Sequence, residues 1–531
     1  MKKKLMGLFC LMFIGLLACG ASAVSAGSVL PTSLEQTAQR VTRDLKAKGY
    51  QVERGYPMLV TQEECDRYTF PIMGTCYGNN PASPYVVMVV KSWEDEFVDP
   101  LTVNAFGKTR RGYSATYRLD PREAIVVFAE LPPPGRYTGL QTWAFTKNWL
   151  TEDKPWNQVR YDQVKAKAPE LVDYLFAKVP GSESRIQSAS TLSNNINNVV
   201  IERQSKAAFG QTRYFIITPD QAMDQTVRNS LDLLGVPDEY VFTEPIPVED
   251  QGHDPNISEV GPIGLDAKAT DFTTGLRYAM PDNEHAAHAW WANLPLTVLR
   301  VRERPSADSP RKPFPPFKAD DRTAKSEIDY ADDLDALVNA VCMRWKQESA
   351  IQKRMIDLQL EVGDFGPQCR SVGMNCILDG QDASYFIAPA NPLDPATPQD
   401  PGWVYAVVGT LGTATGNATY VGLSVNDVSK LKGVLNIPDT DLKGSAEWYS
   451  YNKAIRTDKF FVHYFTRDCQ AIKDYTDGAC TTVTEDMVPP LGEGKQGLFS
   501  TALRSYVYPS TARGPLSSEQ LNPIIIRFAQ P

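Results

Sequence analysis

Apolar side chains recur at two different spacings along this chain, and the spacing separates predicted helices from predicted strands. Between Leu34 and Leu45 they return every three or four residues, the period of an amphipathic helix, which ends at Gly49. An unbroken apolar run at 85–90 instead predicts a buried strand, and a further strand is expected at 123–128. The chain therefore mixes helices and strands from its beginning.

The clearest single unit lies near 213–243. An apolar strand at 213–217 precedes the tetrapeptide Thr-Pro-Asp-Gln at 218–221, which combines the capping threonine, first-turn proline and capping-box glutamine of a helix start. Gly235 ends this helix, and apolar residues at 240–242 begin another strand. The order strand, helix, strand predicts a β-α-β unit.

A second strand-rich region lies in the last third of the chain. Apolar residues on one side predict a long helix near 328–360. Strands are expected at 403–408 and 420–425, joined as a hairpin around a loop rich in glycine and threonine, and also at 460–466. Together the patterns predict an α+β fold with two strand-rich regions.

A segment at 304–325, rich in proline and charged side chains, is interpreted as a linker between domains. It separates an N-terminal α+β domain at 27–303 from a C-terminal domain at 326–531, which contains the long helix and further strands. Residues 1–26 are assigned to a signal peptide. A chain of this length favours two or three domains.

The signal peptide is inferred from its three parts. Three lysines at 2–4 precede an apolar run at 5–18, and small residues then lead to a cleavage site after Ala26. The apolar run is too short to span a bilayer. An alternative is a lipoprotein signal, in which Cys19 carries a lipid anchor. Both alternatives predict a secreted or periplasmic protein of the bacterial envelope.

Net charge and hydropathy argue against two kinds of partner, nucleic acid and a membrane that the chain would span. Removal of the signal takes away three lysines and no acidic residue, so the net charge changes from −9 to −12. An acidic surface disfavours nucleic-acid binding, which needs basic patches. No later segment has enough consecutive apolar residues for a membrane span.

The cysteines favour an oxidising compartment. Six of them fall into close pairs, each closing a short loop of the kind that local disulfides form in exported proteins. The pairs are Cys65 with Cys76, Cys369 with Cys376, and Cys469 with Cys480. Cys342 is left over on the apolar side of the long helix, where a buried and unreactive thiol is expected.

One hypothesis for chemistry is a metal site. His285 and His288 would share one face of a helix, with Glu284 beside them and His253 available from a preceding segment. Imidazole and carboxylate groups of this kind are common ligands of zinc and similar divalent ions. The residues lack the four-residue spacing of histidines in the usual zinc protease motif.

A second hypothesis places an acid and a base at the carboxyl edge of the β-α-β unit. Asp220 and Glu244 both follow predicted strands there, where ligands of α/β proteins commonly bind. Paired carboxylates of this kind hydrolyse glycosidic bonds. A third hypothesis is a sugar-stacking surface formed by Trp143, Trp149 and Trp156.

These observations leave three functions open. The first is an extracytoplasmic binding or envelope-associated protein without catalysis. The second is a secreted hydrolase that acts on polysaccharide or another extracellular polymer through Asp220 and Glu244. The third is a metal-dependent enzyme that uses His285 and His288. No motif identifies a cofactor or a ligand, and the sequence alone does not decide whether the protein is an enzyme.

Overall fold

The computed structural model describes most of the chain after the predicted signal peptide. The described residues are 32–149, 157–167, 169–247, 260–304, 311–315, 320–359, 367–394, 402–450, 455–492, 495–509 and 511–531. They form a strand-rich mixture of helices and several sheets, so the predicted α+β class is confirmed. The predicted signal peptide and the alternative anchor at Cys19 lie outside the described residues.

The strands of the N-terminal half form one large sheet, in which the described residues contribute eleven strands. Its main path runs β6-β5-β10-β2-β1-β11-β4-β8-β9, with β3 and β7 attached to its side. The strands are β1 (Gln51–Val60), β2 (Tyr85–Lys91), β3 (Tyr113–Ser114), β4 (Glu123–Glu130), β5 (Gly135–Asn148), β6 (Arg185–Thr191), β7 (Ile196–Asn197), β8 (Thr212–Thr218), β9 (Val241–Pro245), β10 (Asp271–Pro281) and β11 (Leu296–Arg302).

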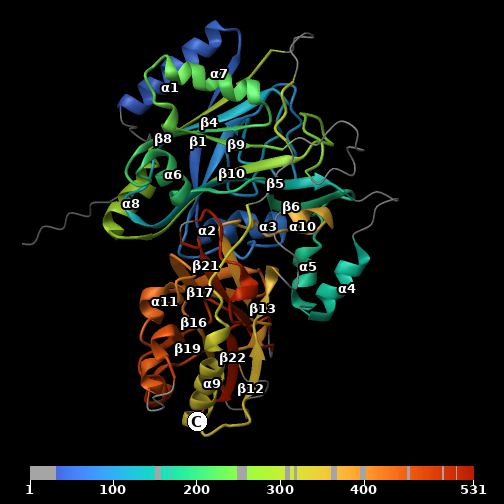
Figure 1. The fold of residues 1–531 in the computed structure, drawn as a ribbon. Helices are drawn as coiled ribbons and strands as arrows, with labels where there is room; N and C mark the ends of the chain where they lie inside the picture. Colours follow the sequence, from blue (N-terminus) through green and yellow to red (C-terminus); the bar gives the residue numbers. More distant parts are fainter. Residues whose placement is uncertain are drawn as a thin grey trace, which may run out of the picture.

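Helices cover parts of both faces of this sheet (Figure 1). The helices α1 (Thr32–Ala47) and α7 (Gln221–Asp232) pack side by side on β4 and β8, and the predicted apolar stripe of α1 is buried there. The helices α6 (Asn198–Ser205) and α8 (Glu284–Asn293) pack into the core of the opposite face. The predicted β-α-β unit is confirmed, because β8 and β9 pair in parallel on either side of α7 in the sequence.

The C-terminal half has three layers. In the described ranges, one sheet has five strands in the order β12-β22-β16-β19-β20, and another has six, in the order β13-β14-β21-β17-β18 with β15 beside β21. These strands are β12 (Ile351–Arg354), β13 (Ile356–Asp357), β14 (Ala383–Ile387), β15 (Asn391–Pro392), β16 (Trp403–Thr410), β17 (Tyr420–Asp427), β18 (Lys432–Pro438), β19 (Phe460–Thr466), β20 (Cys480–Thr482), β21 (Leu498–Tyr506) and β22 (Ile524–Ala529).

Alternation along β16 explains how these layers pack. Val404 and Val408 face the helix α9 (Ala331–Trp345), whereas Tyr405 and Val407 face the six-stranded sheet. Because successive side chains of a strand point to opposite faces, one central strand contributes to both cores. The layer order is therefore α9, the five-stranded sheet and the six-stranded sheet.

Two predictions for the C-terminal half are wrong in detail. The long helix ends at Trp345, because Lys346 adopts a left-handed backbone conformation, and 351–354 form the edge strand β12. The predicted hairpin does not form either. β16 and β17 belong to different sheets, and the short helix α11 (Gly412–Thr415) lies between them. β16 pairs with the distant strands β19 and β22, whereas β17 pairs with the next strand, β18, and with the distant strand β21.

The division into two domains stays a prediction. The eleven-stranded sheet ends at Arg302 and the next strand begins at Ile351, on either side of the predicted linker. Part of the linker is held in place, because the Lys312 amide donates to the Asp220 carboxylate. The two halves are also joined directly, since α2 (Gln62–Glu64), α3 (Phe70–Met73) and α10 (Pro367–Ser371) lie between the two sheet systems (Figure 1).

The described residues hold three disulfides with the predicted pairing, Cys65–Cys76, Cys369–Cys376 and Cys469–Cys480. Cys342 is a buried free thiol, and burial raises its pKa.

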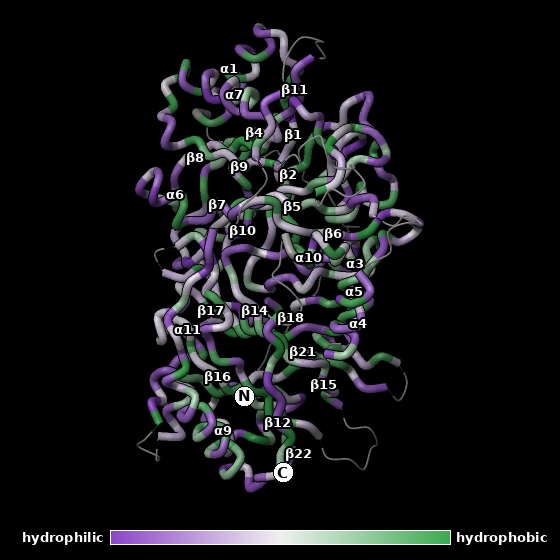
Figure 2. Tube along the Cα trace, turned by 45° about the vertical axis from the view of Figure 1, so that its right-hand side comes forward, coloured by the Kyte–Doolittle hydropathy of each residue, from purple (hydrophilic) through white to green (hydrophobic). Residues whose placement is uncertain are grey.

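Hydrophobic and hydrophilic residues are intermixed along the chain (Figure 2). Within the described part, no helix combines the length and the hydropathy that crossing a bilayer requires.

Candidate functional site

Two adjoining cavities lie where the halves of the chain meet. The outer chamber has a volume of about 300 Å³ and the inner chamber about 60 Å³. Tyr77, Asn80, Tyr85 and Leu378 line both chambers, so they form the boundary between them. Ligand sites of proteins are commonly found at such junctions.

One face of the eleven-stranded sheet forms the floor of the outer chamber. Arg277 of β10 lies directly opposite Tyr85 of β2, and Thr273 lies opposite Trp143 of β5. Positions two residues apart share a face, so Thr273, Gly275 and Arg277 point the same way. A Cβ atom at Gly275 would meet the Trp143 ring at 3.2 Å, so glycine makes room for this indole beside the strand.

The segment between β1 and β2 covers this floor. It begins with a capping box, in which Thr61 and Glu64 satisfy each other's backbone amides at the start of α2. A π-helix at Cys65–Thr69 and α3 follow, and the Cys65–Cys76 disulfide closes the segment. Both of these cysteines line the outer chamber. The disulfide is thus part of the chamber wall.

The rim of the outer chamber reaches the surface. Glu63 is exposed, and Gln62 and Pro81 are partly exposed, while all three line the chamber. Deeper lining residues such as Val87 and Trp143 are buried. The outer chamber therefore runs from a polar rim to an apolar interior.

The six-stranded sheet forms the far wall of the inner chamber. Arg504 and Tyr506 of β21 share a face, and Tyr385 of β14 lies opposite Arg504. Asn426 of β17 lies opposite Ser500 on the same face of β21. Arg277 from the other half completes the lining. The inner chamber is therefore a space between two sheets that are distant in sequence.

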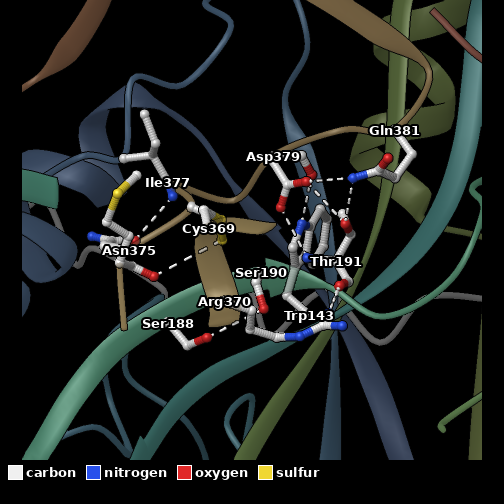
Figure 3. The surroundings of a disulfide bond; sticks show 12 residues. Trp143, Ser188, Ser190, Thr191, Cys369, Arg370, Asn375, Ile377, Asp379 and Gln381 are labelled. Atoms are coloured by element: carbon white, nitrogen blue, oxygen red, sulfur yellow. Dashed lines mark hydrogen bonds between the residues drawn. A yellow bond between two sulfur atoms is a disulfide. The ribbon is translucent and has the colours of Figure 1, made fainter. Parts of the chain in front are cut away.

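A loop at 374–381 carries the C-terminal half across to the N-terminal sheet. The Cys376 amide donates to the Ser188 carbonyl at 2.7 Å, and the Leu378 amide donates to the Ala189 carbonyl at 2.9 Å. The Trp143 indole donates to the Asp379 carbonyl at 2.8 Å. Figure 3 shows these elements around the Cys369–Cys376 disulfide. The loop therefore holds the wall of the chambers against their floor.

The same loop has an unusual backbone. Ile377 and Leu378 both have a φ of 52°, which is the left-handed region that favours glycine. Each such residue costs about 1–3 kcal/mol, and the surrounding structure must enforce it. Here the Asn375 side chain accepts from the Ile377 amide. Ile377 and Leu378 both line the inner chamber. Strain of this kind often marks binding sites.

Four residues that line the chambers each have a buried polar atom that makes no hydrogen bond with the described protein. These atoms are Ser83 Oγ and Thr273 Oγ1 for the outer chamber, and Arg277 Nε and Asn426 Oδ1 for the inner chamber. Each of these side chains is no more than 3% exposed. An unpaired buried polar atom costs about 1–3 kcal/mol, so these four would gain from a partner inside the chambers.

The charged groups of the inner chamber differ in their pairing. Arg277 donates to Gln141 and Asp382, whose carboxylate also accepts from Tyr137. Burial raises the pKa of Asp379 to about 6, while hydrogen bonds from Thr191 oppose that rise. Arg277 is therefore paired with the carboxylate of Asp382, whereas the Asp379 carboxylate is hydrogen-bonded to Thr191.

The proposed carboxylate pair lies elsewhere. Asp220 is the N-cap of α7, and its carboxylate accepts from the amides of Ala222 and Met223 at 2.6 and 3.0 Å. Glu244 lies inside the N-terminal half, where it accepts from the Thr142 amide at 2.7 Å. Burial raises the pKa of Glu244 to about 7. Neither carboxylate lines the two chambers.

The histidines are not gathered with other ligands in the described residues. His285 and His288 are exposed on α8, beside the exposed Glu284. The described part of the chain contains no group of three or more histidine, cysteine, aspartate or glutamate side chains arranged to hold a metal ion. His253, the proposed additional ligand, lies outside the described residues.

The three tryptophans of the sugar-stacking hypothesis lie in different settings. Trp143 is 2% exposed and lines the outer chamber instead of the molecular surface. Trp149 is partly exposed, with the Lys147 ammonium over its ring. Trp156 lies outside the described residues. Trp143 is thus the sequence-predicted site residue that the structure places in the candidate site.

Sequence reasoning missed Arg277, Arg504 and Asn426. No motif connects them, because they come from β10, β21 and β17, and only the fold brings them together. One signal was present. Arg277 lies between Leu276 and Tyr278, Arg504 follows Leu503, and the two arginines are 3% and 5% exposed within their strands. A charged residue inside a buried strand indicates either a buried ion pair or a ligand site.

Comparison with known proteins adds no function. No family model matches the chain, and no curated protein matches it either. A crystal structure of an uncharacterised protein from Burkholderia cenocepacia is similar over 94% of this chain and 87% of that chain, at 8% identity and a TM-score of 0.35. A similarity of this strength carries no conclusion about fold or function.

Proposed function

We propose that this chain is an extracytoplasmic binding protein that holds a small, mainly apolar molecule in the two chambers. The outer chamber provides an apolar interior behind an exposed rim, and the inner chamber provides polar and charged groups. Small-molecule sites typically combine an apolar lining with a few polar groups that orient the ligand. The proposal agrees with the first of the three functions that the sequence leaves open.

The observation that carries this proposal is the clustering of unpaired polar atoms. Ser83, Thr273, Arg277 and Asn426 come from four different segments, and each of these chamber-lining residues has such an atom. The great majority of buried polar atoms in folded proteins are hydrogen-bonded. A ligand that pairs with them is a direct reason for the clustering.

The compartment part of the proposal depends on the cysteines. Three disulfides in the described residues are compatible with an oxidising environment outside the cytoplasm. The lysine-headed apolar leader of the sequence supports the same location. Whether Cys19 carries a lipid is a separate question, which mass measurement of the mature N-terminus answers.

Fluorescence of the neutral apolar dye N-phenylnaphthylamine tests the proposal. We expect saturable binding of one dye per purified chain, with a fluorescence increase. The variant Val87→Phe fills the outer chamber and should weaken dye binding by about tenfold or more, because the dye and the added ring would need the same space. The control Val159→Phe adds the same ring at a side chain that is 68% exposed, and should leave binding unchanged.

Circular dichroism of both variants establishes that each is folded. Saturable dye binding that Val87→Phe leaves intact would contradict the proposed chambers. Absence of saturable binding to the wild-type chain would contradict the binding function itself.

A further inference from the structure

Arg504 has an unusual set of partners for a buried cation. One guanidinium nitrogen donates to the Ser424 hydroxyl, and another donates to the Gly78 carbonyl at 2.7 Å. Both acceptors are neutral. Among the described residues Arg504 forms no ion pair with a carboxylate, although its side chain is 5% exposed.

Such an arrangement is costly without a counterion. Burying a charge is strongly unfavourable unless another charge or several hydrogen bonds compensate for it. Several other buried arginines have a carboxylate partner. Arg277 lies 3.4 Å from Asp382, Arg118 lies 3.1 Å from Asp271, and Arg300 pairs with both Glu96 and Glu123. Arg213 is buried like Arg504 and also donates to neutral oxygens, those of Ser205, Thr212 and Ala207. Of these two arginines, Arg504 is the one that lines the inner chamber.

Nearby acidic groups are engaged with other donors. The Asp379 carboxylate accepts from the Thr191 amide and hydroxyl and from the Gln381 amide, each at 2.9 Å. The Asp382 carboxylate accepts from Tyr137 and Arg277. Neither acid makes an ion pair with Arg504. The charge of Arg504 is therefore available to an anion in the chamber.

We propose that the ligand is a monocarboxylate with an apolar tail, whose carboxylate pairs with Arg504 and whose tail occupies the outer chamber. This inference depends on the proposed binding function. The planar guanidinium matches a carboxylate in geometry and in charge. The inner chamber, at about 60 Å³, is small, and the apolar outer chamber of about 300 Å³ adjoins it. A long-chain acid and an aromatic acid share this chemistry.

Competition against N-phenylnaphthylamine tests the head group separately from the chamber. Decanoate and phenylpropionate represent the two tails, and decanol and phenylpropanol are their neutral counterparts. At pH 8, we expect at least one acid to displace the dye at about tenfold lower concentration than its alcohol, because a hydrogen bond between charged groups is stronger than one between neutral groups. The acid that displaces the dye at the lower concentration shows whether the chamber prefers a long-chain or an aromatic tail.

Variants of Arg504 assign the effect to one residue. Arg504→Gln should bring the acid and its alcohol to equal competition while dye binding persists, and Arg504→Lys should restore part of the preference. The control Arg354→Gln removes an arginine whose side chain is 62% exposed on β12, and should change nothing. Persistent acid preference in Arg504→Gln would overturn the assignment to Arg504.

The two proposals fail in different ways. Equal competition by acid and alcohol in the wild-type chain overturns the carboxylate inference, while the dye still reports a binding chamber. Absence of dye binding overturns the binding function and the carboxylate inference together. If Arg504→Gln does not fold, Arg504→Lys at raised pH decides the question, because the lysine ammonium loses its charge and the preference should disappear with it.

Discussion

Thr273 and Thr297 are two buried threonines of the same sheet, and in both the hydroxyl has no hydrogen-bond partner in the described protein. They differ in one respect, since Thr273 lines the outer chamber and Thr297 lines neither chamber. An unpaired hydroxyl in a packed interior costs about 1–3 kcal/mol, whereas one beside a chamber can be hydrated. The pair therefore compares the hydroxyl of a chamber-lining residue with a hydroxyl in the packed core.

We expect Thr297→Val to raise the free energy of unfolding by about 1 kcal/mol, because the valine methyl replaces an unpaired hydroxyl at similar volume. Thr273→Val should raise it by less than half as much. Urea unfolding of the two variants beside the wild-type chain measures both values. Equal gains would show that no solvent reaches Thr273.

Glu244 gives a prediction for pH dependence. Burial raises its pKa from 4.5 to about 7, so folding favours the neutral carboxyl. The stabilisation by this group is complete below pH 4.5 and is lost as the pH rises through 7. The neutral variant Glu244→Gln lacks that loss. The stability of the variant relative to the wild-type chain should therefore increase by about 3 kcal/mol between pH 4.5 and pH 8.

Chemical unfolding at several pH values measures this difference. The control Glu284→Gln removes an exposed carboxylate of α8 and should show a difference that is independent of pH. A flat difference for Glu244→Gln as well would contradict a neutral buried carboxyl at this position.

At the scale of elements, two disulfides of equal loop length provide a matched comparison. Cys65–Cys76 and Cys469–Cys480 both join cysteines 11 residues apart, but only the first lines the outer chamber. Replacing either pair with serine should cost roughly 3 kcal/mol of stability, because loops of equal length lose equal chain entropy. Only the Cys65→Ser/Cys76→Ser variant should also lose binding of N-phenylnaphthylamine.

Thermal unfolding and dye titration of the two double variants make this comparison. Loss of dye binding in the Cys469→Ser/Cys480→Ser variant would indicate that general destabilisation, and not the chamber wall, controls binding. Retention in both variants would mean that the segment between β1 and β2 keeps its place without its disulfide.

Local patterns predicted the elements that depend on local physics. The stripe from Leu34 to Leu45, the β-α-β unit and the paired cysteines all depend on residues close in sequence, and all three are confirmed. The helix predicted to 360 was too long because 351–354 form an exposed edge strand, which pairs with the distant strand β22. The hairpin at 403–425 was wrong because β16 and β17 are buried on both faces and carry no local sign of their partners.

The candidate site illustrates the same limit more strongly. Trp143 was singled out from the sequence as an exposed sugar-binding ring, yet it lines an internal chamber. Arg277 and Arg504 were not singled out at all. Their meeting depends on the pairing of β10 with β2 and of β21 with β14, which no spacing along the chain encodes.

For the molecule as a whole, Asp382 is a direct link between the halves. It lies immediately before β14, and its carboxylate accepts from Tyr137 at 2.8 Å, Asn197 at 3.3 Å and Arg277 at 3.4 Å. All three donors belong to the N-terminal half. Asp382→Asn would leave the Arg277 cation buried without its carboxylate partner.

We expect Asp382→Asn to lower the free energy of unfolding by about 3–5 kcal/mol, because it breaks a buried ion pair on one side only. Calorimetry should show that the unfolding transitions of both halves lose stability, because the contacts of Asp382 join the two halves. The control Asp458→Asn removes an exposed partner of Lys459 and should cost less than about 1 kcal/mol. An equally small effect of Asp382→Asn would contradict a coupled junction.

The place of β21 in the order of synthesis has a consequence of its own. A ribosome makes the chain from the amino end, so the sheet with Arg277 and Trp143 is complete long before Arg504 exists. A nascent or truncated chain that lacks β21 therefore has an incomplete inner chamber, without the wall that carries Arg504. A fragment that ends before 498 keeps every residue of the outer chamber but lacks Arg504. If the chain binds its ligand as proposed, such a fragment should show no preference for a carboxylate over its neutral counterpart.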